Sequence, residues 1–358
     1  VGITDYNGCL INSQHTITQP ASPVSVSIVD IVPLTCYNSN NGQLSISVNG
    51  GIGPYTATLT LIGTSTQSQL NINPSLSNIG LFSPLAAGNY NLQVMDQNGC
   101  DANFNIQITA PLPLILNVTP TDVACYGQST GQLSIIGNGG LAPLTYTVVG
   151  PIPSAINGSL TSGTASIVSL LPAGVYNITI TDANGCNIQI STTINQAPAL
   201  SILANPLPIA CYGSSTSIIP TISGGAGGYN YSWTASGGGV LSSGATATSQ
   251  VNIPAGVYTL TATDANSCSA SQTWTILQPL TAISATATVS NLTCHNSNNG
   301  QILVSITGGT SNYTITGIGA PVVVVPTANT THLYTNLAGG TYNLLVTDAN
   351  GCTFPLNS

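Results

Sequence analysis

The sequence predicts an all-β chain in which antiparallel β-sandwich repeats of about 85 residues follow one another in tandem, with almost no helix. Three observations support this prediction. A short string, D-x-N-G-C or a close variant, occurs five times along the chain. A second set of cysteines recurs with nearly the same period, and no segment sustains the 3.6-residue apolar period of a helix.

The two sets of cysteines define the repeat. Each copy of the D-x-N-G-C string ends in a cysteine, at Cys9, Cys100, Cys186, Cys268 and Cys352. The second set consists of Cys36, Cys125, Cys211 and Cys294. Successive members lie 82 to 91 residues apart in the first set and 83 to 89 residues apart in the second. Two independent markers with one period indicate a tandem array.

The predicted organisation is a trailing fragment followed by four repeats. We expect residues 1–20 to be the C-terminal strands of a preceding repeat, so that the chain is a segment of a longer array. The repeats are expected at 21–111, 112–198, 199–279 and 280–358, the last with an incomplete final strand. A proline opens each repeat, at Pro20, Pro111, Pro198 and Pro279.

Short alternating stretches separated by turn residues follow each opening proline. Residues 24–28 alternate before the first cysteine, and residues 43–48 place Leu44, Ile46 and Val48 on one side of a strand. A Gly-Gly pair ends that strand, and an aromatic strand such as 229–233 follows. A last pair of strands flanks the D-x-N-G turn. About seven short strands per repeat without helix is the pattern of an immunoglobulin-like sandwich.

Two residue types recur beside the last pair of strands. The tyrosines resemble the tyrosine corner of such sandwiches, with an ordinary half-buried strand tyrosine as the alternative: Tyr90, Tyr176, Tyr258 and Tyr342. The turn aspartates are expected to cap Asx turns that have glycine at positive φ: Asp96, Asp182, Asp264 and Asp348. A calcium site is the alternative, but calcium takes six to eight oxygen ligands and each repeat offers one turn aspartate.

Composition excludes several classes of function. The chain has no Lys or Arg and a net charge of −8, so it lacks the cations that neutralise nucleic-acid phosphates or bind anionic lipid. No apolar run approaches the roughly 18 residues of a membrane helix, so no membrane insertion is expected. With 42% hydrophobic residues the chain is not simply disordered.

No catalytic, cofactor or metal site is predicted. Cys294 is followed by His295, but adjacent strand residues point to opposite faces, and this pair occurs once. No C-x-x-C pair is present for a zinc site. The aromatic residues Tyr229, Tyr231 and Trp233 are a candidate carbohydrate site, with a role in the core and edge of the sandwich favoured instead. We therefore expect that the protein is not an enzyme.

Several motifs together resemble the SprB repeat family. They are Gly-Gly-Ile-Gly-Pro-Tyr at 50–55, Pro-Ala-Gly-Val-Tyr at 172–176 and Thr-Asp-Ala-Asn-Gly-Cys at 181–186. The resemblance implies a very large surface adhesin of gliding Bacteroidota, exported by the type IX system, and it does not identify the ligand. The chain departs from the family in having no Lys or Arg, in Ser267, and in lacking a proline before Tyr313. The missing cations leave open whether the protein serves gliding motility or another surface structure.

The repeat-locked cysteines indicate structural disulfides in an extracellular chain. Two pairing schemes are open. Pairing within repeats gives Cys36–Cys100, Cys125–Cys186, Cys211–Cys268 and Cys294–Cys352. Pairing across repeat boundaries gives Cys36–Cys186, Cys125–Cys268 and Cys211–Cys352. The second scheme is favoured because, in an immunoglobulin-like topology, the cysteines of one repeat lie at opposite poles, about 20 Å apart, whereas a disulfide needs Cα atoms within about 7 Å.

We expect the chain to act as a stalk or filament segment of a secreted adhesin, stiffened by disulfides at the cell surface. Its expected partners are neighbouring repeats of the same chain, other copies in a filament, and a surface or glycan ligand. Two alternatives remain: an array of carbohydrate-binding modules, and a filament subunit that polymerises without covalent bonds. Exposed aromatic residues would favour the first alternative, and burial of Trp233 and Trp274 would count against it.

Overall fold

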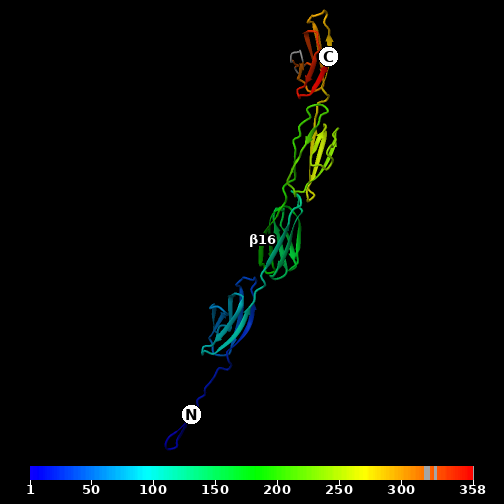
Figure 1. The fold of residues 1–358 in the computed structure, drawn as a ribbon. Helices are drawn as coiled ribbons and strands as arrows, with labels where there is room; N and C mark the ends of the chain where they lie inside the picture. The colour runs from blue at the N-terminus through cyan, green and yellow to red at the C-terminus, as the bar shows by residue number, and fades with distance from the viewer. Residues whose placement is uncertain (318–322, 326–328, 358) are drawn as a thin grey trace. The chain divides into compact units, whose positions relative to one another are not determined.

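The structure is a computed structural model that describes residues 1–317, 323–325 and 329–357. These residues form β-strands, turns and irregular segments, with no helix among them, and the prediction of a tandem array of immunoglobulin-like antiparallel sandwiches is confirmed (Figure 1). The chain divides into two compact units. One unit comprises Val1–Asp122 and Gly131–Asn195, and the other comprises Val123–Thr130 and Gln196–Ser358.

The first sandwich is preceded by a hairpin of β1 (Gly2–Thr4) and β2 (Leu10–Asn12). Its three-stranded sheet has the order β3 (Ser25–Val32), β4 (Gly42–Asn49), β7 (Ile79–Leu85). Its four-stranded sheet has the order β6 (Gln67–Ile72), β5 (Tyr55–Leu61), β8 (Gly88–Met95), β9 (Asp101–Ile108). All pairs are antiparallel, and the turn that carries Cys100 joins β8 to β9.

The second and fourth sandwiches repeat this topology. In the second, the sheets are β10 (Ile115–Thr121), β11 (Gly131–Asn138), β14 (Ser166–Leu171), and β13 (Ile156–Leu160), β12 (Leu144–Val149), β15 (Gly174–Thr181), β16 (Asn187–Ile194). In the fourth, they are β24 (Ser284–Ser290), β25 (Gly300–Thr307), β28 (Thr331–Leu337), and β27 (Val323–Val325), β26 (Tyr313–Gly317), β29 (Asn343–Thr347), β30 (Thr353–Asn357). The last strand, β30, has five residues where β9 and β16 have eight.

The third sandwich departs from this plan. Its strands pair as β17 (Ser201–Leu203) with β19 (Thr221–Ser223), β18 (Thr216–Ile218) with β21 (Gln250–Ile253), and β20 (Asn230–Ser236), β22 (Gly256–Thr263), β23 (Ser269–Ile276) in one sheet. Pro220 lies between β18 and β19. Proline has no backbone N–H to donate to a ladder, so the strand that is continuous in the other sandwiches is divided here.

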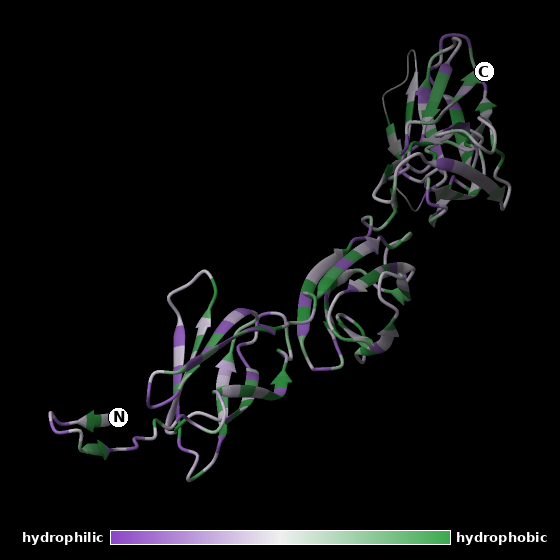
Figure 2. Cartoon of the chain, turned by 90° about the horizontal axis from the view of Figure 1, so that it is seen from below, coloured by the Kyte–Doolittle hydropathy of each residue, from purple (hydrophilic) through white to green (hydrophobic). Residues whose placement is uncertain are grey.

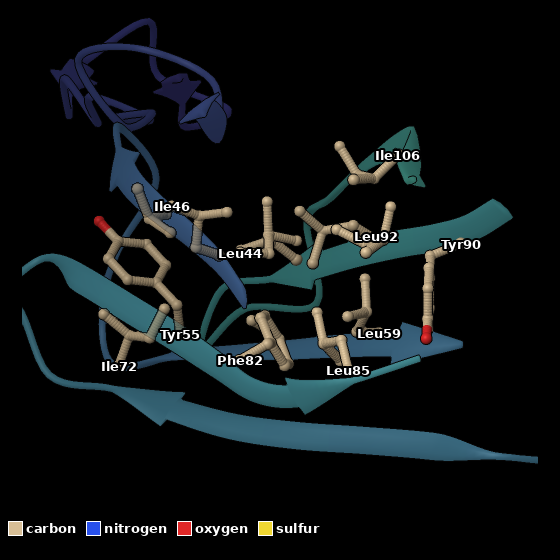
Figure 3. Close-up of a cluster of buried hydrophobic side chains, with 14 of the residues drawn as sticks. Leu44, Ile46, Tyr55, Leu59, Ile72, Phe82, Leu85, Tyr90, Leu92 and Ile106 are labelled. Atoms are coloured by element: carbon tan, nitrogen blue, oxygen red, sulfur yellow. The ribbon is translucent and has the colours of Figure 1, made fainter. Parts of the chain in front are cut away.

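The core of the first sandwich follows from strand alternation. Leu44, Ile46 and Val48 of β4 are at most 1% exposed, as their two-residue spacing predicts. They pack with apolar residues of β5 and β8 from the facing sheet, and Figure 3 shows Tyr55 and Tyr90 near opposite ends of this core. Polar and apolar residues alternate in the same way along strands of the other sandwiches (Figure 2).

Two outer strands expose apolar side chains. In β3 the register shifts between Ile28 and Asp30, and Ile28 is 47% exposed although it belongs to the alternating stretch 24–28. A β-bulge of this kind reorients the residues beside it. In β16, an edge strand of its sheet, Ile188 and Ile190 are each 38% exposed. Within the described part of the chain, no helix is long and apolar enough to cross a membrane.

Candidate functional site

The D-x-N-G-C turn is built around its aspartate. In the turn between β8 and β9, one carboxylate oxygen of Asp96 accepts hydrogen bonds from the backbone N–H groups of Asn98 and Cys100, each at 2.9 Å. Gly99 has φ +85°, a conformation that glycine adopts without steric cost. The Asp96 side chain is 5% exposed, whereas Cys100 is exposed. This is the Asx-type turn that the sequence pattern favours.

The second carboxylate oxygen of Asp96 ties this turn to another loop. It accepts a hydrogen bond of 3.0 Å from the backbone N–H of Ile52, which follows the Gly-Gly pair. Three of the other four turns make the same contact: Asp182 with Leu141, Asp264 with Ala226, and Asp348 with Thr310. The backbone N–H groups of Ile52, Cys100 and Asn98 lower the pKa of Asp96, with Ile52 contributing most. The N–H of Ala226 likewise contributes most to the lowered pKa of Asp264.

Both positions of the Gly-Gly pair require glycine, because of backbone conformation and close contacts. Gly50 has φ +72°, and a Cβ added there would lie 2.0 Å from the carbonyl oxygen of Pro23. The N–H of Gly51 donates to the carbonyl of Ser22 at 2.9 Å, and a Cβ on Gly51 would lie 2.8 Å from the Asp96 carboxylate. The chain segment before the first strand therefore packs directly on the pair. We call the glycine pair, the turn aspartate and this segment the pole cluster.

The predicted tyrosines anchor the other end of the last strand pair. The hydroxyl of Tyr90 donates to the carbonyl of Ala86 at 2.9 Å. The equivalent bonds run from Tyr176 to Pro172, Tyr258 to Pro254, and Tyr342 to Ala338, at 2.8, 2.8 and 3.0 Å. A hydroxyl bonded to a carbonyl a few residues upstream is the defining contact of a tyrosine corner.

A second tyrosine, for which no role was predicted, is bonded to the pole cluster. The Tyr55 hydroxyl donates to the carbonyl of Gly50 at 2.6 Å. Tyr229 and Tyr313 make the same bond to Gly224 and Gly308. The second sandwich has Leu144 at this position. The available signal was a tyrosine five residues after the first glycine of the pair.

Three disulfides join the two sets of cysteines. The bonds are Cys36–Cys186, Cys125–Cys268 and Cys211–Cys352, with Cα–Cα distances of 5.7, 5.6 and 5.6 Å. The structure thus brings together the three pairs that the pole argument favoured, and it forms none of the within-repeat pairs. Each bond connects the loop after a first strand to a D-x-N-G-C turn 141 to 150 residues later. Cys9, Cys100 and Cys294 are exposed and unbonded among the described residues.

Each disulfide is accompanied by a hydrogen bond from the turn asparagine. The side-chain amide of Asn184 donates to the carbonyl of Thr35, the residue before Cys36, at 2.8 Å. Asn266 and Asn350 donate in the same way to the carbonyls of Ala124 and Ala210, at 3.1 and 3.0 Å. The loop and the turn therefore meet at two points, one covalent and one polar. The asparagine that recurs in every copy of the string was the signal for this contact.

A hollow lies beside two of these disulfides. Beside Cys36–Cys186, about 250 Å³ is lined by Tyr37, the segment 111–114, Gly140 and Asp182. Beside Cys125–Cys268, about 360 Å³ is lined by the equivalent Tyr126, segment 197–200, Gly225 and Asp264. In both, the residue after the loop cysteine forms one wall and the pole cluster forms the other.

The other candidate sites are resolved as follows. Trp233 and Trp274 are 2% and 9% exposed, and their ring centroids lie 5.8 Å apart in the core of the third sandwich. The indole N–H of Trp233 donates to the carbonyl of Ala247 at 2.8 Å. Across the described ranges, no group of three or more His, Cys, Asp or Glu side chains is placed to hold a metal ion.

Comparison with solved structures gives distant similarities. A tetra-tandem repeat from the extending region of a large adhesion protein is 17% identical, covering 94% of this chain and 99% of that chain, with a TM-score of 0.29. Invasin, a bacterial integrin-binding protein, is 10% identical over 94% of this chain and 79% of that chain, with a TM-score of 0.34. A bacterial ice-binding adhesin of 1.5 MDa is 14% identical over 72% and 99%, also with a TM-score of 0.34. TM-scores this low carry no inference about function.

Comparison with protein families gives a specific match. No curated protein sequence matches the chain. The SprB repeat model matches residues 28–60 and 286–316. These ranges contain the loops of Cys36 and Cys294 and the strands around them, in the first and fourth sandwiches. The chain therefore carries SprB repeats at these two regions, which confirms the resemblance that the sequence motifs indicated.

Proposed function

We propose that this chain is a stalk segment of a secreted cell-surface adhesin, in which disulfides between successive repeats limit how far the stalk can be stretched. The observation that carries the proposal is the spacing of the three bonds, which overlap along the sequence at separations of 150, 143 and 141 residues. The SprB repeats support a place at the cell surface, and disulfides are typical of oxidising, extracellular compartments. Repeats bounded at 21–111, 112–198, 199–279 and 280–358, export by the type IX system and a role in gliding belong to the same proposal.

The bonds create a short covalent path through a long chain. From Cys36 the path crosses to Cys186, follows the backbone to Cys211, and crosses to Cys352. Only 25 residues of backbone lie on it, although Cys36 and Cys352 are 316 residues apart in the sequence. At ~3.5 Å per extended residue, the path allows about 90 Å, against about 1,100 Å for the reduced chain.

Part of this short path is already extended. β16 (Asn187–Ile194) and β17 (Ser201–Leu203) lie on it, and strand residues rise about 3.3 Å each, close to the limit of a stretched chain. Force applied to the ends would therefore load this segment, while the strands outside it stay shielded by the disulfides. A stalk built in this way would resist extension even if a sandwich lost its fold.

Stretching single molecules by their two ends tests the proposal. In the oxidised chain, only the residues before Cys36, those after Cys352 and the short covalent path are free to extend. We therefore expect no further increase in length when a sandwich unfolds under oxidising conditions. After reduction, each sandwich should release roughly 300 Å, for about 85 residues at ~3.5 Å each. Full unfolding lengths from the oxidised chain would overturn the proposal.

Two cysteine variants sharpen this test. Cys125→Ser removes a bond that is not on the shortest path, so the oxidised limit should not change. Cys211→Ser forces the path through Cys268 and Cys125, which lengthens it from 25 to 145 residues and should add about 400 Å. Because both variants lose one disulfide, the difference between them reports the path and not the number of bonds.

An array of carbohydrate-binding modules is less well supported. Stacking on a sugar ring needs an exposed aromatic face, and both tryptophans are buried in the core of the third sandwich. The aromatic strand of that sandwich supplies packing: Trp233 belongs to the core cluster, and Tyr231 packs against it.

A further inference from the structure

The loop that carries Cys36 is held in shape by its own side chains. The Asn41 side chain accepts a hydrogen bond from the Thr35 N–H at 3.2 Å and donates to the Thr35 hydroxyl at 2.7 Å. The Ser39 hydroxyl donates to the Cys36 carbonyl at 2.9 Å. The same bonds recur in the fourth sandwich, within residues 293–299. In these two sandwiches the conformation of the cysteine loop is therefore fixed locally.

The loops that carry Cys125 and Cys211 have different residues at two of these positions. Ala124 and Ala210 stand in the place of Thr35, and Thr130 and Thr216 stand in the place of Asn41. Alanine has no hydroxyl to accept the asparagine bond, so the bond between these two side chains cannot form. These loops therefore need support from another part of the chain.

A glutamine from the repeat boundary supplies that support. The side-chain oxygen of Gln196 accepts a hydrogen bond from the Gly127 N–H at 2.8 Å, and that of Gln278 accepts one from the Gly213 N–H at 2.9 Å. Each glycine lies two residues after the loop cysteine. Each glutamine follows the last strand of the same sandwich, so the bond ties the loop to the segment that leads into the next repeat.

The first sandwich has alanine where the second and third have glutamine. Ala110 lies two residues after β9, as Gln196 does after β16 and Gln278 after β23. In the first and third sandwiches, the residue before this position accepts a backbone hydrogen bond of 2.9 Å from the segment that leads to the cysteine loop. The glutamine thus occurs where the loop lacks its own side-chain network, and alanine occurs where that network is present.

We propose that Gln196 and Gln278 are positioning residues for disulfide formation, which hold the reduced cysteine loop in the conformation that bonds to the turn of the next repeat. In this conformation the loop presents two groups to the turn: the cysteine sulfur, and the preceding carbonyl that accepts from the turn asparagine. Once formed, the disulfide holds the loop by itself, so the glutamine acts mainly on the reduced chain. This role holds whether or not the chain serves as a stalk.

The step that the glutamine assists is a thiol–disulfide exchange with a low-molecular-weight disulfide as the oxidant. The Cys211 thiolate attacks that disulfide and releases one small thiolate, and the Cys352 thiolate then attacks the Cys211 sulfur and releases the second. Two protein thiols become one disulfide, one small disulfide becomes two thiols, and the two protons lost by the protein pass to those thiols. Gln278 takes no part in the exchange; it raises the fraction of reduced chains in which the two sulfurs can meet.

The redox equilibrium of the full chain with glutathione tests this role. The chain is equilibrated at a series of ratios of oxidised to reduced glutathione, free thiols are blocked, and the pairs are mapped with pepsin, since there is no Lys or Arg for trypsin. Gln278→Ala should lower the equilibrium constant for Cys211–Cys352 by about 2- to 10-fold, the bias that one hydrogen bond supplies. The constant for Cys36–Cys186, measured in the same molecules, should not change.

Three further variants are matched to this one. Gln278→Glu keeps an oxygen that accepts from the Gly213 N–H, so it should keep the native constant. Gln196→Ala should weaken the disulfide of the Cys125 loop and leave the other two unchanged. Asn41→Ala breaks the side-chain network of the first loop, and it should weaken the disulfide of that loop alone.

The redox constant separates positioning from a general effect on stability, because it compares two folded states. A hydrogen bond that stabilised the sandwich equally with and without the disulfide would leave the constant unchanged. An unchanged constant in Gln278→Ala, an equal shift of all three disulfides, or a glutamate variant that behaves like the alanine variant would each overturn the role. The digest of the native chain reports whether the three disulfides form at all, so failure of the glutamine role is distinguished from failure of the stalk proposal.

Discussion

The first and third sandwiches share their pole cluster and differ in what they attach to it. Both have a glycine pair against the preceding segment, an aspartate that accepts three backbone hydrogen bonds, and a tyrosine bonded to the first glycine. In the first, β4 is a continuous strand of eight residues that pairs with β3 and β7. In the third, this strand is divided at Pro220, which takes the place of Ile46 relative to the glycine pair.

The difference indicates which part of the repeat is constrained. The third sandwich has fewer strand pairs than the first, and it buries two tryptophans where the first has smaller residues. Trp233 has the same position in the pairing of β20 with β22 as Leu59 has in the pairing of β5 with β8. The pole cluster positions the cysteine turn and keeps the same contacts in both. We infer that the strands can vary as long as the core is filled, whereas the glycine pair and the turn aspartate are constrained, because they position the turn that contacts the cysteine loop of the preceding repeat.

The largest expected effect is loss of the buried tryptophan. Trp233→Ala should lower the free energy of unfolding of the third sandwich by about 3–5 kcal/mol, through the cavity it leaves and the lost bond to Ala247. Both tryptophans of the chain lie in this sandwich, so the remaining Trp274 fluorescence follows its unfolding in urea. Leu59→Ala is the matched control in the first sandwich and should leave that signal unchanged. An effect below about 1 kcal/mol would mean that the tryptophan does not replace the missing ladder.

A smaller effect is expected from the glycine pair, and it should be equal in both sandwiches. A Cβ at Gly224 would lie 2.0 Å from the carbonyl oxygen of Ala199, as a Cβ at Gly50 would from that of Pro23. Gly224→Ala should lower the free energy of unfolding by roughly 3 kcal/mol, combining positive-φ strain and displacement of the preceding segment. Gly227→Ala is the control, because Gly227 has φ +74° but no atom within 4 Å, so only strain of about 1 kcal/mol remains. If Gly224→Ala and Gly227→Ala lowered the free energy of unfolding equally, the argument that the preceding segment packs on the glycine pair would fail.

The tyrosine corner should contribute more to stability in the third sandwich than in the first. The Tyr258 hydroxyl donates to Pro254 at 2.8 Å and accepts from the N–H of Val240 at 3.2 Å, whereas the Tyr90 hydroxyl is bonded to Ala86. Each buried hydrogen bond contributes about 0.5–1.5 kcal/mol, so Tyr258→Phe should cost about twice as much as Tyr90→Phe. Urea unfolding followed by tryptophan fluorescence for Tyr258 and by hydrogen exchange of 21–111 peptides for Tyr90 gives the two values. A larger cost at Tyr90 would contradict the comparison.

Much of the fold could be read from the sequence because its signals are local and repeated. The alternation of Leu44, Ile46 and Val48 correctly placed them in a core, and cysteine spacing gave the period. The exposure of Ile28 was missed, because a bulge depends on how two strands pair and not on the residues of one strand. Division of the third sandwich could have been expected from Pro220, since proline interrupts a ladder wherever it falls in a central strand.

The disulfide pairing could be predicted because it depends on topology alone. The side-chain hydrogen bonds of the site could not be predicted. Opposite poles within one sandwich favoured Cys36 with Cys186, which the structure joins. The hydrogen bond from Asn184 to the Thr35 carbonyl connects residues that lie 149 apart in the sequence. The repeat period does not predict which atoms of two such distant residues meet. The tyrosine bonded to the first glycine was similarly missed, because Tyr55 also fits an ordinary aromatic strand position.

The smallest predicted effect concerns acid, where the two sandwiches should differ. The pKa of Asp96 is lowered by the Ile52 N–H and that of Asp101 by the side-chain amides of Gln93 and Asn103, so the first sandwich holds two such carboxylates. The third holds one, because Asp264 has a lowered pKa and Ser269 stands where Asp101 does. A folded-state pKa below the usual ~3.9 adds stability above that pH, and this stability is lost as the pH falls through the folded-state pKa.

The first sandwich should therefore lose more stability than the third on going from pH 6 to pH 3. Hydrogen exchange of 21–111 peptides, set against tryptophan fluorescence of the third sandwich in urea at the two pH values, measures the difference. Asp101→Ser gives the first sandwich the residue of the third and should remove the excess without altering the Asp96 contacts. An excess that persists in this variant would assign the acid sensitivity to another group, and equal losses in the native chain would show that the exposed Asp101 bonds contribute nothing to folding.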